Sequence, residues 1–295
     1  MFDWENLRYF YALAQAGSLS AAARTLAVEH ATVSRRVAAL EAELGARLLE
    51  RLPRKVELTE TGRRVQALAA QIEEVAFGIE RVIRAGQSDL RGRVVVSAPL
   101  TVVAHFLAPA AAMFRQRYPE IELVLTSEST VVSLTRREAD LSLRLARPSE
   151  ADYVAQPLGE MLFRLYASPR YPRLRRPRDW EFVAYDPDHD AYPLAREILK
   201  IAGTRTIALR VNDMSTQLAI AASGAGVAML PCFLAEASAD LVGVGSDAFA
   251  LEVWLAVHGE LKESGPIKAV RTFIAELMKS SGRLEPPRGR ARPRT

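Results

Sequence analysis

Hydrophobic positions repeat with helical spacing from the start of the chain. The apolar residues of a first predicted helix, over 4–16, share one helical face: Leu7, Phe10, Tyr11 and Ala14. Gly17 follows at the position where glycine commonly ends helices. Ser20 is then the expected N-cap of a short helix over 21–27. Two short helices joined by a tight turn are predicted.

A third helix is predicted over 30–44. One side carries the stripe expected to be buried, Val33, Val37, Leu40 and Leu44. The opposite side carries small residues and one long cation: Ala31, Thr32, Ser34, Arg35 and Ala38. Such a surface suits the major groove of DNA, because alanine permits close approach and arginine can reach guanine O6 and N7. Arg36 lies nearer the stripe, where a phosphate contact is expected.

A basic hairpin follows this helix. Arg51, Arg54 and Lys55 surround Pro53 and precede Val56-Glu57-Leu58. A short wing of this kind can press cations against the sugar-phosphate backbone or into the minor groove. Taken alone, the helix would be an ordinary amphipathic helix with a solvated arginine, and the cluster would be solvated surface. Together they favour a helix-turn-helix with a wing, in which Ser20 is also expected to contact DNA.

A heptad seam then runs along a long predicted helix. Its apolar positions recur at spacings of three and four residues: Val65, Leu68, Ile72, Val75, Ile79 and Val82. A helix of about 26 residues would span about 39 Å, too long for a small domain to cover. We expect the seam to meet the same helix of a second chain, the alternative being packing on its own chain. Residues 86–92 are expected to form a hinge.

The remaining two thirds alternate between strand and helix patterns. Strands are expected from residue 93 and near 121–126, 140–145, 162–167, 181–185, 206–211 and 226–230, with helices that include 102–117 and 129–138. This alternation predicts parallel α/β sheets in two lobes.

Ligands of open α/β sheets bind beyond the carboxyl ends of strands. The first strand ends at residues that also open a helix, whose amides favour an anion: Ser97, Pro99, Leu100 and Thr101. Arg144 could pair an acidic ligand or form a salt bridge with Asp140 or Glu138. Asn212 could contact the ligand from the second lobe or cap a helix.

Composition bounds the class of protein without identifying it. No apolar run is long enough for a membrane span, no signal segment begins the chain, and Cys232 is the single cysteine, so a cytoplasmic protein is expected. The formal charge of +4 is carried by the tail 283–295, which holds five arginines and one glutamate. The tail is expected to be disordered.

Catalysis has little support in the sequence. The four histidines are widely separated and no nucleophile elbow or zinc spacing is present. Gly224-x-Gly226 lacks the third glycine of a dinucleotide loop, and Asp188-His189-Asp190 is typical of a polar turn. We therefore expect no catalytic residues, no metal and no cofactor.

The quoted segments resemble one bacterial family in both order and spacing. Leu-Arg-Tyr-Phe-Tyr-Ala-Leu-Ala-Gln-Ala-Gly-Ser-Leu-Ser, Thr-Val-Ser-Arg-Arg-Val and Leu-Thr-Glu-Thr-Gly are similar to the LysR-type transcriptional regulators over essentially all of 1–90. The resemblance implies that Thr32, Ser34 and Arg35 face DNA. Glu29-His30 depart from the Ser or Thr followed by Gln that is common there, and Leu49 replaces a common Phe.

The resemblance also implies a type II periplasmic-binding-protein-like fold with a small-molecule cleft between two lobes. It extends in outline over 93–280, notably at Ala139-Asp-Leu-Ser-Leu-Arg144 and Leu165-Tyr-Ala-Ser-Pro169. Expected partners are double-stranded DNA, a second copy in a homodimer or tetramer, and a small organic effector that Arg144 suggests is anionic. RNA polymerase is a further partner that the resemblance would allow.

We therefore expect an effector-controlled transcriptional regulator built from four parts. They are a winged helix-turn-helix (1–62), a linker helix and hinge (63–90), an effector domain (91–282) and a basic tail (283–295). Lobe I is expected over 91–160 plus about 266–280, and lobe II over about 161–265. The alternatives are an effector-independent architectural DNA-binding protein and an enzyme that uses the α/β domain.

Overall fold

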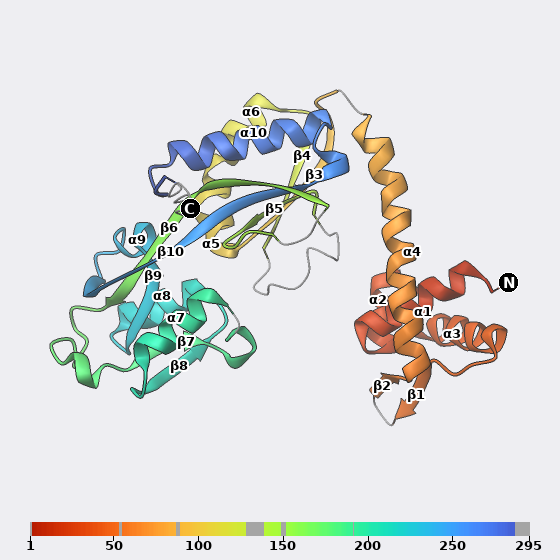
Figure 1. Ribbon diagram of the computed structural model, residues 1–295, viewed down its shortest axis with the longest axis horizontal. Helices are drawn as coiled ribbons and strands as arrows, with labels where there is room; N and C mark the ends of the chain where they lie inside the picture. Colours follow the sequence, from red (N-terminus) through yellow and green to blue (C-terminus); the bar gives the residue numbers. More distant parts are fainter. Residues whose placement is uncertain are drawn as a thin grey trace, which may run out of the picture. The chain divides into compact units, whose positions relative to one another are not determined.

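The computed structural model describes residues 2–52, 55–86, 89–127, 139–148, 152–190 and 192–286 (Figure 1). For 51, 52, 55, 74, 77, 78, 80–82, 84 and 85 it describes the backbone alone. The chain divides into two compact units, Met1–Ile83 and Arg84–Thr295. We call them the DNA-binding unit and the effector unit, after the roles expected from the sequence.

Three helices form the body of the DNA-binding unit: α1 (Trp4–Ala16), α2 (Leu19–Leu26) and α3 (His30–Leu44). Gly17 ends α1 in the left-handed conformation, with φ 66°, as predicted. The prediction that Ser20 caps α2 was wrong. Ser18 is the N-cap, and its hydroxyl accepts from the amide of Ala21 at 3.3 Å, which places Ser20 inside the helix.

The core of this unit joins α3 to α1 and α2. Val33, Val37 and Leu40 are buried, as predicted, against residues that include Phe10 and Leu13. Leu44 was expected to complete the stripe, but it is 37% exposed. It is the last residue of α3, and the left-handed Gly45 turns the chain away there, so no layer covers its side chain.

The predicted wing and long helix follow. β1 (Leu49–Leu52) and β2 (Lys55–Leu58) pair antiparallel, and α4 (Glu60–Ala85) begins directly after them. Gly62 lets α4 pack on the wing, because a Cβ atom at that position would lie 2.0 Å from the carbonyl oxygen of Leu48.

The effector unit is built on one eight-stranded sheet in the order β4-β3-β5-β10-β6-β9-β7-β8. Its strands are β3 (Gly92–Ala98), β4 (Ile121–Ser127), β5 (Leu141–Arg144), β6 (Tyr153–Ala167), β7 (Phe182–Tyr185), β8 (Ile207–Val211), β9 (Val227–Pro231) and β10 (Val242–His258). β3, β4 and β5 are parallel, as are β7, β8 and β9. The long strands β6 and β10 pair antiparallel between the two sets. The all-parallel expectation was therefore wrong at the centre of the sheet.

Helices cover each set of strands, giving two lobes (Figure 1). In lobe one a helical run over 100–117 comprises α5 (Leu100–Val102), the π turn η1 (Val103–Leu107), the 3₁₀ turn η2 (Ala108–Ala110) and α6 (Ala111–Arg117), and α10 (Gly265–Ser280) packs on β3 and β6. In lobe two α7 (Pro193–Ala202), α8 (Met214–Ser223) and α9 (Cys232–Ala235) pack on β6, β7, β8 and β9. One continuous hydrophobic core serves both lobes. The helix expected over 129–138 lies outside the described residues.

The first residues of the expected disordered tail are packed on the effector unit. Glu285 and Glu160 exchange two backbone hydrogen bonds, of 2.8 and 2.9 Å. The guanidinium of Arg283 donates to the carbonyl of His105 at 2.5 Å and lies 5.6 Å from the ring centres of Phe106 and Phe233. The tail prediction was thus wrong for 283–286, whereas 287–295 lie outside the described residues.

No helix in the described part of the chain is long and apolar enough to cross a membrane.

Candidate DNA-binding and effector-binding sites

α3 presents the face that was expected to meet DNA. Ala31, Arg35 and Ala38 are exposed, and Thr32 and Ser34 are half-buried beside them. Within the described residues, no hydrogen bond or ion pair engages the Arg35 guanidinium. Glu29 is the N-cap of α3, and its side chain makes no capping bond, in keeping with the departure noted at that position. Arg35 can therefore reach outward from a helix whose opposite side is anchored.

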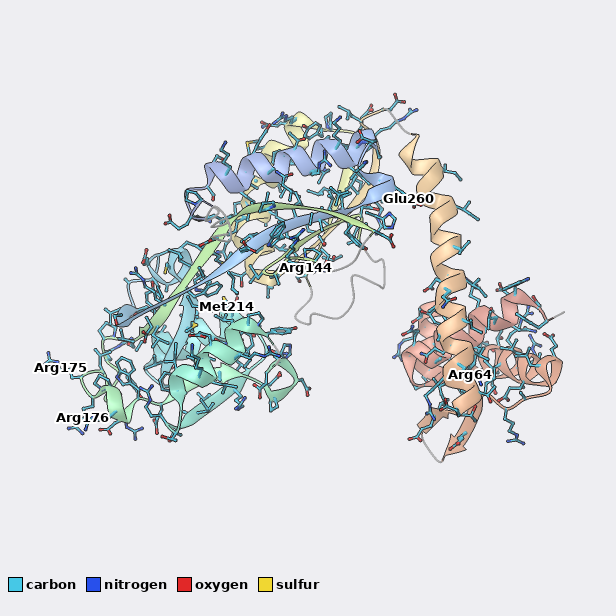
Figure 2. All side chains as sticks on the ribbon, in the orientation of Figure 1. Arg64, Arg144, Arg175, Arg176, Met214 and Glu260 are labelled. Carbon is cyan, nitrogen blue, oxygen red and sulfur yellow. The ribbon has the colours of Figure 1, made fainter. Side chains whose placement is uncertain are left out.

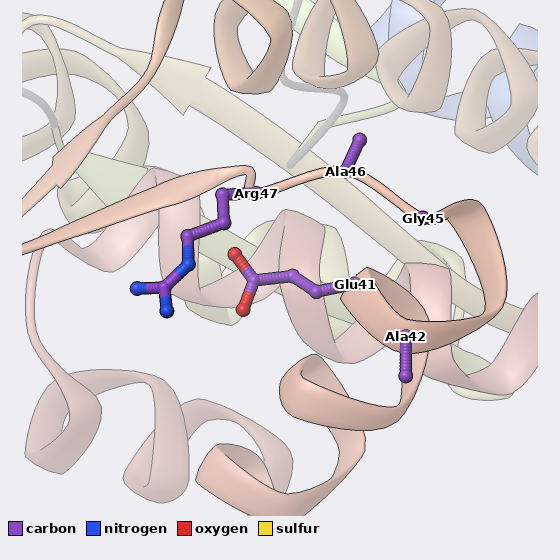
Figure 3. Close-up of a pocket in the computed structure, with 5 residues that line it drawn as sticks. All are labelled: Glu41, Ala42, Gly45, Ala46 and Arg47. Atoms are coloured by element: carbon purple, nitrogen blue, oxygen red, sulfur yellow. The ribbon is translucent and has the colours of Figure 1, made fainter.

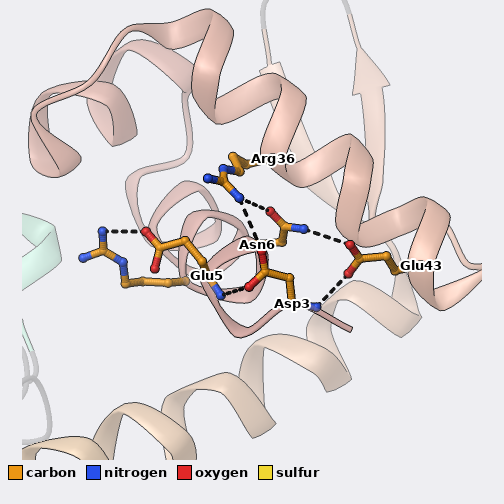
Figure 4. A network of polar contacts seen from close by, with 6 residues as sticks. Asp3, Glu5, Asn6, Arg36 and Glu43 are labelled. Carbon is orange, nitrogen blue, oxygen red and sulfur yellow. Dashed lines mark hydrogen bonds and ion pairs between the residues drawn. The ribbon is translucent and has the colours of Figure 1, made fainter. Parts of the chain in front are cut away.

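Arg36 is tied to α1 instead. Its guanidinium donates to the side-chain oxygens of Asp3 at 3.4 Å and Asn6 at 3.2 Å, and it lies 5.7 Å from the Tyr9 ring centre (Figure 4). Glu43 completes this network by accepting from the amide nitrogen of Asn6 and from the backbone of Asp3. The network docks the middle and the C-terminal end of α3 on the start of α1, a role that the sequence analysis missed for Arg36.

Glu41 joins α3 to the start of the wing. Its carboxylate accepts from the backbone amides of Leu48 at 2.7 Å and Leu49 at 3.1 Å. A pocket of about 360 Å³ lies beside this contact and is lined by Glu41, Ala42, Gly45, Ala46 and the exposed Arg47 (Figure 3). Glu41 thereby sets the position of the wing relative to α3.

The other expected phosphate contacts are only partly described. Arg51 and Lys55 lie in β1 and β2, with their side chains outside the description, and Arg54 lies outside it altogether. Ser20 is exposed on α2. A DNA contact at these four residues remains a prediction.

The predicted seam of α4 is packed on the DNA-binding unit at its first residue and exposed at the later described residues. Val65 packs against the core of the DNA-binding unit. The next seam residues are exposed, by 59% at Leu68, 38% at Ile72, 68% at Val75 and 63% at Ile79. Ile83, which the heptad count had left out, is 67% exposed, and the Val82 side chain lies outside the description.

In the effector unit, Arg144 and Ser97 lie together where β3 and β5 end. The Arg144 guanidinium donates to the hydroxyl and the carbonyl oxygen of Ser97, both at 3.2 Å, and to the carbonyl of Leu143 at 2.9 Å. Asp140, one of the expected ion-pair partners, accepts from the amide of Val95 at 2.9 Å, and Glu138 lies outside the described residues. The sequence-predicted pair of Ser97 and Arg144 is thus brought into direct contact.

The other residues predicted at this strand end differ in accessibility. Leu100 is 44% exposed and Pro99 is half-buried, whereas Thr101 is only 9% exposed. α5, which they begin, is three residues long before the backbone enters the π turn. Leu100 is therefore better placed than Thr101 to meet a ligand.

Ser142 is a polar residue at this site that the sequence analysis missed. It is the register partner of Ser97 and lies two residues before Arg144, so all three side chains share one face of the sheet. Its hydroxyl is buried and has no hydrogen-bond partner in the described part of the structure. The alternation of side chains along β5 could have identified it.

In lobe two, Asn212 is exposed at the end of β8, and Asp213, not Asn212, caps α8. Burial acts to raise the pKa of Asp213, but bonds from the Thr216 hydroxyl and from two backbone amides lower it overall. Figure 2 shows Arg144 on the edge of lobe one and Met214, the first residue of α8, on the edge of lobe two. Because Asn212 is exposed and Asp213 caps the helix instead, the Asn212 side chain is available to a ligand.

Within the described ranges, no three His, Cys, Asp or Glu side chains lie close enough to hold a metal ion. His189 is buried and bonds to Asp186 through Nδ1, and its ring contacts Tyr185 and Tyr192. Asp188-His189-Asp190 therefore forms part of a turn, η5 (Pro187–His189), packed by aromatic rings.

Comparison with known families and proteins assigns both units. The family described as "Bacterial regulatory helix-turn-helix protein, lysR family" matches residues 4–63, and "LysR substrate binding domain" matches 87–279. The Mau operon transcriptional activator of Paracoccus denitrificans is 28% identical over 93% of this chain and 96% of its own length. The HTH-type transcriptional regulator CrgA of Neisseria meningitidis serogroup B is 36% identical over 57% of this chain and 56% of its own length.

Solved structures share the fold. Full-length AphB, a virulence activator of Vibrio cholerae, is 21% identical with a TM-score of 0.59 over 93% of this chain and 99% of its own. The structure of Neisseria meningitidis CrgA is 25% identical with a TM-score of 0.55, over 94% of this chain and 99% of its own. The protein thus belongs to the LysR family of transcriptional regulators, whose members bind DNA and small-molecule effectors and form oligomers.

Proposed function

We propose that the protein is a homodimeric or tetrameric regulator that reads an operator through α3 and answers to a small anionic effector. The observation that carries this proposal is the exposed face of α3. Arg35 extends from it between Ala31 and Ala38, while Val33, Val37 and Leu40 anchor the other side. Arginine can donate twice to guanine, and small neighbours let the helix approach the bases.

The remaining DNA contacts of the proposal serve affinity. Thr32 and Ser34 flank the Arg35 face, and Ser20 with the wing cations Arg51, Arg54 and Lys55 would contact phosphates. Arg36 contributes by holding α3 on α1, given its bonds to Asp3 and Asn6.

The effector would bind where the lobes present polar groups, with Arg144 and Ser97 from lobe one and Asn212 from lobe two. Arg144 is held by three hydrogen bonds, so its planar cation is oriented before a carboxylate or phosphate arrives. An effector can control DNA binding only if it binds one arrangement of the lobes and subunits more tightly than another. Pairing of α4 between two chains would carry that change to the two copies of α3.

The test compares Arg35→Ala with Arg115→Ala, which removes an exposed cation from α6. An operator would first be selected from random-sequence DNA with the wild-type protein. Arg35→Ala should lower the preference for that operator over random DNA by about 1–3 kcal/mol, because it removes a base contact. Equal losses on operator and random DNA would favour an architectural DNA-binding protein instead.

A further inference from the structure

The chain between β6 and β7 concentrates positive charge on lobe two. Residues 169–180, here called the arginine loop, contain five arginines and one aspartate. Outside this loop and the C-terminal residues 283–295, acidic residues outnumber basic ones. The loop is therefore a local feature and does not follow from the overall composition of the chain.

The backbone of the arginine loop is held firmly in place. Trp180 is buried and donates from its indole nitrogen to the carbonyl of Leu174 at 3.1 Å. The buried Tyr171 accepts the amide of Glu181 on its hydroxyl at 2.9 Å. Successive i to i+3 turns, ending in η4 (Pro177–Asp179), satisfy the backbone between these anchors. The arginines project from a fixed scaffold, which lowers the entropy lost when they bind.

Three of the five arginines have no partner within the described structure. Arg173 pairs with Glu181, and Arg170 lies 3.7 Å from Asp240. Arg175, Arg176 and Arg178 are exposed, and no described hydrogen bond or ion pair engages them. Figure 2 shows Arg175 and Arg176 extending outward from the surface of lobe two.

We propose that the arginine loop binds the phosphate backbone of double-stranded DNA, as a contact separate from the winged helix-turn-helix. Guanidinium groups match phosphate oxygens in a bidentate geometry, and such contacts need cations but no base-specific groups. The loop would raise the affinity for DNA of any sequence and leave the choice of operator to α3.

The surface of the loop favours DNA over an acidic protein partner. Its large apolar side chains Tyr171 and Trp180 are buried, Leu174 is half-buried, and none of the strongly exposed large hydrophobic residues of the chain lies within 169–180. Protein interfaces are anchored by aromatic or aliphatic side chains at their centre. Phosphate binding needs no such anchor.

The experiment uses the full chain and a long random-sequence duplex. Arg175→Ala, Arg176→Ala and Arg178→Ala are combined in one variant. The matched control combines Arg115→Ala, Arg164→Ala and Arg196→Ala, which removes the same charge from exposed sites dispersed over α6, β6 and α7. Binding is measured by fluorescence anisotropy across a range of salt concentrations, and circular dichroism with thermal melting confirms that both variants fold.

Loss of three phosphate contacts per bound loop should make the negative slope of log K against log salt less steep by about 2.7. The fall in affinity between about 50 and 200 mM salt should then be about 40-fold smaller than in the wild type. The dispersed control should keep nearly the wild-type slope. Operator preference, the readout of Arg35, should not change in the loop variant, so failure of the loop and failure of α3 are seen separately.

A loop variant with the wild-type slope overturns the proposal. The proposal also fails if the loop variant and the dispersed control reduce the steepness of the slope equally, since net charge alone would then account for the effect. Loss of binding to polyglutamate with an unchanged DNA slope would also overturn it, by assigning the loop to an acidic polypeptide.

Discussion

The two units of the chain treat their functional surfaces in opposite ways. In the DNA-binding unit, Arg35 projects from α3 without a described partner. Five apolar side chains of α4 are exposed: Leu68, Ile72, Val75, Ile79 and Ile83. In the effector unit, Arg144 is held by Ser97 and Leu143, and the strongly exposed apolar residues are scattered, as Met113 and Leu209 illustrate. The proposed base-contacting arginine of the first unit extends outward, whereas the proposed effector-binding arginine of the second is held by hydrogen bonds within its own unit.

The difference follows from what each unit has to recognise. A recognition helix meets a ligand that is larger than itself, so its cation must extend beyond the domain surface. A small effector is instead surrounded by the protein, and groups oriented beforehand lower the cost of binding it. An isolated apolar stripe on a long helix is explained by a second helix that covers it.

The largest expected effect tests whether the DNA-binding unit can be destabilised without destabilising the effector unit. Gly62→Ala should cost about 3 kcal/mol, at the upper end of overpacking, because the new Cβ would collide with the Leu48 carbonyl and push α4 from the wing. Gly45→Ala is the control. Unlike Gly62, Gly45 has a positive φ, 62°, but a Cβ atom added there would meet nothing within 4 Å, so a cost of about 1 kcal/mol is expected from the backbone conformation alone.

Thermal unfolding and DNA affinity would measure both variants. Gly62→Ala should lose DNA binding while an effector still stabilises the second unit. Simultaneous loss of both properties would show that the units depend on each other.

Val75→Glu should dissociate the assembly. A charge at this 68% exposed seam position would be buried without a partner in a pair of α4 helices, which raises the dissociation constant by about 100-fold or more. Gln66→Glu introduces the same charge on the opposite side of α4 and should leave the assembly intact. Sedimentation velocity distinguishes the two; an unchanged profile for Val75→Glu would exclude the seam.

Arg144→Ala should remove the response to anions at a modest cost in stability. Losing its bonds to Ser97 and Leu143 is expected to cost about 1–2 kcal/mol. A saturating carboxylate or phosphate ligand should stabilise the wild type by about 2.7 kcal/mol at 100 times Kd, and should not stabilise the variant. Arg144→Lys keeps the charge but loses the planar fork, so a weakened response is expected. If the anion raised the melting temperature of Arg144→Ala as much as that of the wild type, the anion site would not include Arg144.

The smallest effect concerns how helices begin in the two units. The N-cap of α3, Glu29, makes no side-chain capping bond, whereas the N-cap of α8, Asp213, accepts from the Thr216 amide at 2.9 Å. Because the pKa of folded Asp213 is lowered, its stabilisation is present above the unfolded value and is lost as the pH falls through the folded value. Asp213→Asn keeps a capping side chain without the titration. Its melting temperature should therefore change less than that of the wild type between pH 5 and pH 3; parallel curves would contradict this.

The DNA-binding unit was largely predictable because its information is local. Helical spacing located α1 and α3, and Gly17 marked the end of α1. Ser18 and Ser20 are chemically equivalent as caps, so only the backbone could choose between them. The role of Arg36 was hidden because its partners Asp3 and Asn6 are some thirty residues away in the sequence.

The centre of the effector sheet was missed because its strands carry strand-breaking residues. β6 contains Pro157 and Gly159, and β10 contains Gly245, with φ of 150° and 72° at the two glycines. Pairing shifts register between Val253 and Trp254 and between Val244 and Ala248, so these residues mark irregularities inside long strands. The lobe boundary expected at residue 160 consequently falls within β6.

At the effector site, sequence order was enough to bring Ser97 and Arg144 to the ends of parallel strands. The bond between the Asp140 carboxylate and the backbone amide of Val95 could not be predicted in the same way, because backbone groups leave no trace in the residue pattern.

β6 and β10 make the connection between the lobes a two-stranded ribbon. A change in the angle between the lobes is consequently a torsion of that ribbon, shared among many peptide units and resisted by each ladder bond. Glu285 adds backbone bonds at Glu160, which stiffens the ribbon near the irregularity at Gly159. An effector that rotates the lobes would therefore have to twist this ribbon, and the free energy of that distortion would oppose its binding.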